Sequence, residues 1–217
     1  MIMNLRFGRG AQKGLLALLA FMLLLTTGSL SAHAADNPKV TVTVENRGDI
    51  VLELYQSDAP KTVAHFLALV NKKFYDGILF HRVRPGFMAQ VGDPKTKTVE
   101  AAKIRDLSDE QLSMAGIGGG GSGQNIPFEN NNKTNETGTI AMALSAPASA
   151  TGDSQFFINL VNNHRLDTQY CVFGKVVKGM DVVEKIQQGD KIKSMRVGDL
   201  TKSGDTKKTK TKKQVKE

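Results

Sequence analysis

The stretch LFHRVRPGFMAQVGD, at residues 79–93, decides the fold of this chain. Its apolar run is interrupted by Pro85-Gly86, a pair typical of tight turns, so we predict two short strands, 79–83 and 87–91, joined at this turn. Side chains alternate between the faces of a strand, so the spacing allows three functional side chains to converge. They are Arg82, Met88 and Gln90. Polar groups held within an apolar surface are typical of a binding site.

Further segments of alternating apolar residues predict a mainly β chain. Residues 40–44 and 50–54 alternate on both sides of Asn46-Arg47-Gly48-Asp49 and predict a β-hairpin with one buried face. Later short segments, separated by turn residues, are typical of a barrel or a sandwich. These segments are residues 138–144, 156–160, 170–177 and 192–197.

Two segments have helical spacing. The segment from Pro60 to Lys73 predicts a helix that packs one apolar stripe on the sheet, with Ser57 and Asp58 offering N-cap oxygens. A second, shorter helix is predicted at residues 180–187. His65 lies between the apolar positions of the first helix, so we interpret it as a helix surface residue. The histidines without a partner at metal-ligand spacing are His65, His81 and His164, so we expect no metal.

Length and charge indicate one neutral domain with charged ends. The 217 residues, 40% of them hydrophobic, can bury one core. The formal net charge is +8, and it comes from three basic residues in the first 34 residues and from seven Lys against two acidic residues in the last 17. Residues 35–200 carry no net charge, which excludes a basic face for nucleic acid. The single Cys171 excludes an internal disulfide, and we expect a buried structural thiol rather than a reactive one.

The two ends have their own signatures. Residues 1–34 have a positive start, an apolar run from Leu15 to Leu25 and the cleavage motif Ala32-His33-Ala34, which predict a secretory signal peptide cleaved near Ala34. The alternative is a permanent anchor, although the run is shorter than the ~20 residues that span a bilayer. We expect an exported protein of the bacterial periplasm. Residues 201–217, rich in Lys and without aromatic residues, predict a disordered tail.

Residues 94–117, called the insertion below, interrupt the strand pattern. Within them Ser108 and Gln111 have capping-box spacing, which predicts one or two helical turns. GIGGGGSG follows at residues 116–123. It is not a phosphate loop, because no Lys-Ser or Lys-Thr follows, and not a nucleophile elbow, because Ser122 lacks the second glycine that this motif requires.

The motif FHRVxPGFMxQ within residues 80–90 resembles the signature of the cyclophilin family of peptidyl-prolyl cis-trans isomerases. Four further segments resemble cyclophilin segments in the same order: GTIAMAL (138–144), SQFFIN (154–159), RLD (165–167) and VFGKVVKGMDVVEKI (172–186). The similarity runs from about Lys39 to Leu200, with the insertion poorly matched. It implies that residues 35–200 form a closed eight-stranded antiparallel β-barrel with a helix at each end, of the bacterial periplasmic branch.

By position, the resemblance implies a proline pocket beside a catalytic arginine. The catalytic residues would be Arg82 and Gln90, with Gln90 orienting Arg82. The substrate-binding residues would be Phe87, Met88, Gly116, Ala143, Leu144, Gln155, Phe157, Leu166 and Tyr170. Alternatives stay open at this point: Phe87 and Phe157 could be plain core residues, and the loop at Gly116 could be a flexible connector.

Two positions depart from the animal members of the family. Tyr170 stands where a His usually lines the pocket, which keeps the apolar ring. Arg165 stands where a Trp is frequent, so we expect weaker cyclosporin binding with the chemistry retained.

The chemistry needs no nucleophile and no cofactor. Rotation about an X-Pro bond breaks amide conjugation, against a barrier of about 18–20 kcal/mol. A twisted prolyl nitrogen regains its lone pair and accepts a hydrogen bond, which the planar nitrogen does not. Arg82 is the permanently charged donor of the motif, and its alternative role is that of a surface salt-bridge partner.

The leading hypothesis is therefore an isomerase acting on X-Pro bonds of exported or unfolded proteins. The alternative is a chaperone module that binds Pro-containing segments with little catalysis. The expected partners are proline-containing polypeptides. The tail adds a weak contact with anionic surfaces, unless it is simply a solvated charge run. We expect a monomer.

Overall fold

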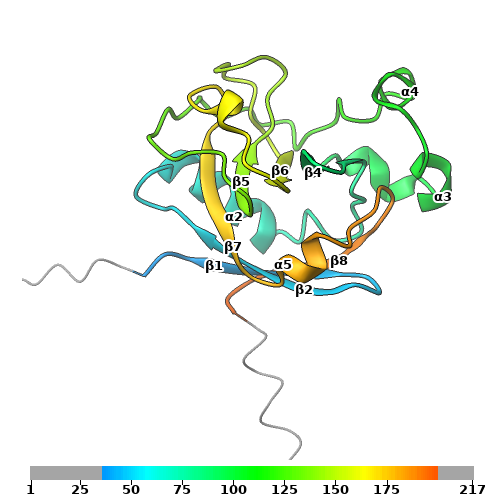
Figure 1. The fold of residues 1–217 in the computed structure, drawn as a ribbon, viewed down its shortest axis with the longest axis horizontal. Helices are drawn as coiled ribbons and strands as arrows, with labels where there is room; N and C mark the ends of the chain where they lie inside the picture. Colours follow the sequence, from blue (N-terminus) through cyan, green and yellow to red (C-terminus); the bar gives the residue numbers. More distant parts are fainter. Residues whose placement is uncertain (1–35, 200–217) are drawn as a thin grey trace, which may run out of the picture. The chain divides into compact units, whose positions relative to one another are not determined.

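Eight antiparallel strands form one curled sheet in the computed structural model, which describes residues 36–199 (Figure 1). The predicted leader and the predicted Lys-rich tail lie outside these residues. The strands are β1 (Lys39–Val44), β2 (Gly48–Leu54), β3 (Arg82–Arg84), β4 (Met88–Val91), β5 (Thr139–Met142), β6 (Phe156–Asn159), β7 (Val172–Lys178) and β8 (Ile192–Val197). Their order in the sheet is β3-β4-β6-β5-β7-β2-β1-β8.

The predicted first hairpin is confirmed. Val42 lies opposite Ile50 in the β1–β2 register, and the turn between the strands places Asn46 and Gly48 at positive φ angles of 59° and 131°. Glycine adopts such angles without the steric cost that a Cβ brings, and asparagine tolerates them. The turn residues therefore set the register that buries the alternate valines.

The predicted closure of the barrel is not confirmed, because no strand ladder joins the edge strands β3 and β8 within the described residues. β3 is only three residues long, so the irregular segment before it makes the contact, with the first residue of β8 and with the segment before β8. Phe80 N donates to Asp190 O at 2.8 Å and Gly189 N donates to Phe80 O at 2.8 Å. Ile192 N donates to Ile78 O at 2.9 Å. These backbone hydrogen bonds bridge the gap without forming a continuous ladder.

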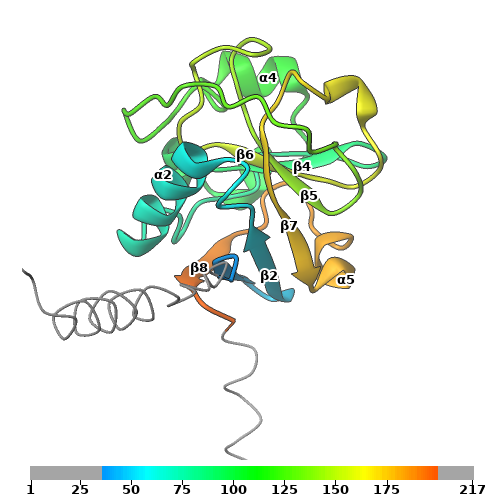
Figure 2. The ribbon, with the colours of Figure 1, turned by 90° about the vertical axis from the view of Figure 1, so that its left-hand side faces the viewer.

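The helices differ from the predicted pair of caps. Figure 2 shows α2 (Pro60–Asn71) and α5 (Met180–Val183) on opposite sides of the strands. The insertion adds α3 (Ala101–Ile104) and α4 (Asp109–Met114), so the described residues hold four α-helices. Two 3-10 helices complete the set, at Pro94–Thr98 and His164–Leu166. No helix in the 36–199 range is long and apolar enough to cross a membrane.

The N-terminus of α2 is capped from a distance. Neither Ser57 nor Asp58 caps it, because the N-cap position is Ala59, which makes no side-chain hydrogen bond. The Glu129 carboxylate instead accepts from Lys61 N at 3.0 Å and from Thr62 N at 2.7 Å. A carboxylate at this end also complements the helix dipole.

The surface assignment of His65 is wrong. Its exposed fraction is 8%, and its Nε2 lies 3.5 Å from Asp153 Oδ1, because the segment between β5 and β6 covers this face of α2. The predicted burial of Cys171 is confirmed, and burial raises the pKa of its thiol to about 11. A thiol with such a pKa is protonated at neutral pH and is a poor nucleophile.

Aromatic rings fill the core between α2 and the sheet. The Phe66 ring lies 5.4 Å from Tyr75, 5.3 Å from Phe156 and 5.2 Å from Phe173, with tilted or edge-on geometry. All four side chains are almost fully buried. Edge-to-face contacts of this kind add to the free energy of burial.

Candidate active site

The β3–β4 hairpin places the central side chains opposite each other. Arg82 is the Cα partner of Gln90, and Arg84 is the partner of Met88. Gly86, with a φ angle of 72°, makes the turn, which Phe87 N closes by donating to Arg84 O at 3.0 Å. Both strands are shorter than predicted, but the turn and the facing pairs are as the alternation indicates.

One row of facing residues crosses the sheet from this hairpin. Gln90 on β4 lies opposite Phe157 on β6, which in turn lies opposite Ala141 on β5. Residues directly opposite in neighbouring strands project from the same face. The register alone therefore brings Arg82, Gln90 and Phe157 onto one face, away from the core.

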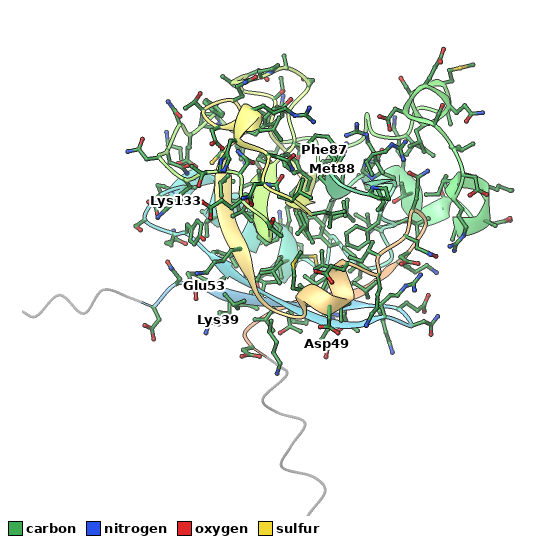
Figure 3. All side chains as sticks on the ribbon, viewed as in Figure 1. Lys39, Asp49, Glu53, Phe87, Met88 and Lys133 are labelled. Carbon is green, nitrogen blue, oxygen red and sulfur yellow. The ribbon has the colours of Figure 1, made fainter. Side chains whose placement is uncertain are left out.

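These residues surround an apolar cavity of about 140 Å³. The residues lining it are Arg82, Phe87, Met88, Gln90, Ala143, Leu144, Phe157, Leu166 and Tyr170. The Phe157 and Tyr170 rings meet edge-on at 5.8 Å. Figure 3 shows Phe87 and Met88 on the side of the sheet toward the insertion helices and far from Lys39 and Asp49. Nine of the eleven residues predicted for the site thus line one cavity.

The remaining two predicted residues lie beside the apolar cavity. Gln155 lines a more polar cavity of about 270 Å³, which shares Gln90, Ala143 and Leu144 with the first. Gly116 lines a cavity of about 490 Å³ between the insertion and the sheet, which shares Arg82 and Gln90. Gln90 therefore lines all three cavities.

Buried amides hold the Leu166 wall of the apolar cavity in place. Asn163 donates from Nδ2 to Phe87 O at 3.0 Å and to Asn159 Oδ1 at 2.8 Å. Burial alone would raise the pKa of Asp167, but hydrogen bonds from Asn135 and His164 lower it. The carboxylate of Asp167 is thus kept charged, and it fixes the loop that carries Leu166.

Arg82 is held by a residue that the sequence did not single out. Its Nε donates to Asp109 Oδ1 and its Nη2 donates to Asp109 Oδ2, both at 2.8 Å. The hydrogen bonds from Arg82 lower the pKa of Asp109 and keep it ionised. Arg82 is therefore a salt-bridge partner, as the alternative interpretation stated, and it also lines the apolar cavity. Gln90 directs its amide nitrogen to Gln155 Oε1 at 3.0 Å.

Arg165 lies over the Phe87 ring, with Cζ 4.7 Å from the ring centroid. The guanidinium therefore covers a ring that lines the apolar cavity. Cation–π contact of this kind keeps the rim ring covered.

Two carboxylates pin the glycine-rich segment. Asp93 is fully buried, and its Oδ2 accepts from Gly118 N at 2.6 Å and from Gly120 N at 3.3 Å. Asp153 accepts from Ser122 Oγ and from Gly123 N. A Cβ on Gly120 would lie 2.0 Å from Asp93 Oδ1, so the segment needs glycine there.

The pinned segment in turn receives Gln155. Its Nε2 donates to Gly118 O at 2.8 Å and to Gly120 O at 2.7 Å. The segment is thus a fixed border of the polar cavity, and the flexible-connector alternative does not describe it.

His81 lies beneath this segment with 2% of its surface exposed. Burial lowers its pKa to about 4, so the ring is neutral at physiological pH. Among residues 36–199 no group of three or more His, Cys, Asp or Glu side chains could hold a metal ion.

Sequence reasoning missed Asp93, Asp109 and Asp153, all of which act on residues far along the chain. Asp93 lies 27 residues from Gly120, and Asp109 lies 27 residues from Arg82. The glycine-rich segment itself was the available signal, because small residues allow backbone N–H groups to surround a carboxylate.

Comparisons with known proteins agree with the geometry. The family model described as "Cyclophilin type peptidyl-prolyl cis-trans isomerase/CLD" matches residues 39–214. The chain is 41% identical over 177 residues to a probable peptidyl-prolyl cis-trans isomerase of Brucella suis, covering 80% of this chain and 84% of the relative. It is 38% identical over 156 residues to peptidyl-prolyl cis-trans isomerase B of Bacillus subtilis, covering 71% and 94%.

A solved structure gives the same result. The crystal structure of a cyclophilin-type peptidyl-prolyl cis-trans isomerase of Cryptosporidium parvum matches with a TM-score of 0.61 and 26% identity, covering 75% of this chain and 98% of that one. A second structure of that protein, in the presence of the dipeptide Ala-Pro, matches with a TM-score of 0.58.

Proposed function

The chain belongs to the cyclophilin-type peptidyl-prolyl cis-trans isomerases, and we propose that it uses Arg82 to rotate X-Pro bonds of exported or unfolded polypeptides. It is an enzyme of this class. We propose the catalytic role of each residue, the class of polypeptide on which the enzyme acts, and the compartment in which the enzyme works.

The apolar cavity is the place for the proline ring. Met88, Phe157 and Leu166 give it apolar walls, and its volume of about 140 Å³ suits one small ring rather than a large side chain. A pocket that excludes water favours the twisted amide, because the twisted amide has lost the polarity of the planar one. The cavity therefore holds the ring while the preceding carbonyl group turns.

Arg82 supplies the donor for the twisted amide. Its Nη1 lies 4.0 Å from Met88 Sδ at the wall of the cavity, while Nε and Nη2 are occupied by Asp109. A charged donor aimed at a nitrogen that gains a lone pair in the transition state binds that state better than the ground state. This placement of a guanidinium at the edge of an apolar cavity is the observation that carries the proposal.

The substrate class follows from the shape of the site. The polar cavity beside the apolar one is lined by Ala143, Leu144 and Gln155 among other residues, and a second, more polar cavity next to the first suits a peptide that continues beyond the proline. The Ala-Pro dipeptide with the Cryptosporidium parvum protein supports a proline-containing ligand for this chain. The pattern of residues 1–34 supports export, so the proposed clients are chains that fold in the bacterial periplasm.

The experiment compares Arg82→Ala with Arg196→Ala in residues 35–217. Arg196 also forms a two-pronged pair, with Asp76, but it lies on β8. Arg82→Ala is expected to lower kcat/KM for a proline peptide by about tenfold or more, since loss of one transition-state donor commonly costs this much. Arg196→Ala is expected to retain the rate. Equal activity of folded Arg82→Ala and the parent would exclude Arg82 from the mechanism.

The Lys-rich tail supports a second, weaker contact. Seven Lys residues in the last 17 can be attracted to anionic surfaces, at about 1 kcal/mol per residue near a membrane and less as salt rises. Co-sedimentation with anionic vesicles at low salt, lost on truncation after Leu200, is the expected result. Equal sedimentation of both chains would contradict the contact.

A further inference from the structure

We propose that Asp109 is a positioning residue for Arg82, supplied by the insertion. The proposal rests on the proposed function, because it explains how the catalytic guanidinium is aimed. Asp109 would act through Arg82 and would not itself touch the substrate.

The contact between the two residues fixes one edge of the guanidinium. Asp109 accepts from Nε and Nη2 of Arg82 through its two oxygens, both at 2.8 Å. A fork of this kind fixes the plane of the guanidinium as well as its position. The remaining nitrogen, Nη1, is then directed at Met88 Sδ, 4.0 Å away, in the wall of the apolar cavity. Asp109 therefore occupies the outer edge of the fork and leaves the inner edge for the substrate.

The helix that carries Asp109 is anchored at its start. Ser108 Oγ accepts from Gln111 N at 3.2 Å, and Gln111 Oε1 accepts from Ser108 N at 2.9 Å, which completes a capping box. The predicted capping box is thus confirmed. Asp109 is the first residue of α4, directly after this cap. The cap therefore fixes its backbone position through contacts that do not involve Arg82.

A small apolar cluster attaches α4 to the sheet. It consists of the buried side chains of Leu79, Ile104, Leu112 and Ile117. Gln188 adds a polar link, since its Nε2 donates to Ile104 O at 2.6 Å and to Leu107 O at 2.9 Å. Its Oε1 accepts from Arg84 Nη1 at 3.0 Å. The insertion is therefore tied to β3, the strand of Arg82, by contacts that do not involve Asp109.

The amide of Gln90 is engaged elsewhere. It donates to Gln155 at 3.0 Å, and Gln155 continues to the glycine-rich segment. The family resemblance assigns the orienting of Arg82 to Gln90. In this structure the charged Asp109 is a second candidate for that role. Gln90 aligns the polar cavity, and Asp109 aligns Arg82.

The Arg82–Asp109 pair is partly exposed, so its loss should change the rate more than the stability of the fold. The exposed fractions of the Arg82 and Asp109 side chains are 30% and 49%. Ion pairs this exposed add little to the stability of a fold. Removal of Asp109 should therefore leave the fold in place and act on the rate.

The decisive comparison is Asp109→Asn against Glu110→Gln, measured as kcat and KM on a proline peptide. Both changes remove one negative charge from the first turn of α4, and among the described residues Asp109 pairs with Arg82 and with Arg84, whereas Glu110 pairs with neither. Asp109→Asn is expected to lower kcat by about three- to tenfold with KM little changed, because a misaligned donor weakens the transition state alone. Glu110→Gln should leave kcat within about twofold. Asp109→Glu, which keeps the carboxylate, should recover most of the rate.

A spectroscopic readout reports the position of the guanidinium itself. The Nε–H signal of Arg82 in the ¹H–¹⁵N NMR spectrum is expected to move on Asp109→Asn and to stay in place on Glu110→Gln. In an Arg82→Ala background Asp109→Asn should cause no further loss, since its effect passes through Arg82.

The outcomes separate this proposal from the proposed function. An Asp109→Asn enzyme with unchanged kcat would overturn the positioning role. A higher kcat would also overturn it, because it would show that Asp109 restrains Arg82. The same loss in Glu110→Gln would also overturn it, since charge in α4 would then be the cause. Full activity of Arg82→Ala would instead remove the proposed role of Arg82.

Discussion

Phe156 and Phe157 are neighbours on β6, yet they belong to different parts of the molecule. Phe156 points into the aromatic core, 5.3 Å from Phe66, and Phe157 points into the apolar cavity, 5.8 Å from Tyr170. On β5, the neighbours Ile140 and Ala141 also face opposite sides: Ile140 belongs to the core and Ala141 to the cluster at the site. One face of the sheet therefore stabilises the fold, and the other face builds the site. Substitutions on the two faces should differ in which property they change.

The largest expected effect is on the core face. Phe156→Ala should reduce the free energy of unfolding by about 3–5 kcal/mol, because the ring is buried on all sides and leaves a cavity behind. Phe157→Ala should cost less stability, because its ring already borders an open cavity, and should raise KM for proline peptides. Urea unfolding and steady-state kinetics on both variants check this. Equal losses of stability would contradict the division into faces.

The next effect tests the fixed border of the site. Gly120→Ala should destabilise the protein by about 1–3 kcal/mol, as overpacking does, because its Cβ would meet Asp93 Oδ1 at 2.0 Å. Gly119→Ala is the matched control, since the nearest atom to its Cβ is Gly116 O at 4.0 Å. Thermal melting of the two variants measures the difference. If both melt at the same temperature, Asp93 does not fix this segment.

A smaller effect concerns pH, and it compares two carboxylates with lowered pKa values. The pKa of Asp76 is raised by burial but lowered more by hydrogen bonds from Arg196 and Met195, and that of Asp109 is lowered by Arg82. A carboxyl group with a lowered folded pKa stabilises the fold above its ordinary pKa of 3.8, and this contribution is lost as pH falls through the folded pKa.

The free energy of unfolding should therefore fall from about pH 5 to about pH 2. Asp76→Asn should flatten this dependence more than Asp109→Asn, because the Asp76 side chain is 26% exposed and that of Asp109 is 49% exposed. Urea titrations across this range measure it. A larger flattening in Asp109→Asn would show that the Asp109–Arg82 pair stabilises the fold more than the Asp76–Arg196 pair does.

The smallest effect is confined to the rim of the site. Arg165→Trp should leave stability and isomerase rate unchanged and strengthen cyclosporin binding by about three- to tenfold, because an indole over Phe87 offers a larger stacking surface than the guanidinium at 4.7 Å. A binding titration checks the affinity. An unchanged affinity would show that Arg165 does not correspond to the family's Trp.

The sequence was most informative where structure is local. Alternation and turn residues predict the β1–β2 and β3–β4 hairpins, and capping-box spacing predicts α4, because each depends on residues a few positions apart. The cavity residues were predicted through family resemblance, and the register of β4, β5 and β6 explains why they meet.

The contacts that were missed all join distant segments. Glu129 caps α2 from 67 residues beyond Thr62, and Asp153 reaches the buried His65 from another loop. Asp109 comes from the insertion, residues 94–117, where the resemblance of motifs offered no guide. Such pairings depend on tertiary packing, which no local pattern encodes.

The pairing of β1 with β8 also bears on how the chain folds. Val40 lies opposite Val197, so the first strand of the sheet finds its second neighbour near the end of the described residues. Contacts of such high sequence separation raise the contact order and slow folding, because a long loop must close before they form. The sheet therefore cannot be completed until β8 is available to pair with β1. Until β8 pairs, one edge of β1 keeps its backbone N–H and C=O groups unpaired, and an unpaired edge of this kind is a template for association with another chain.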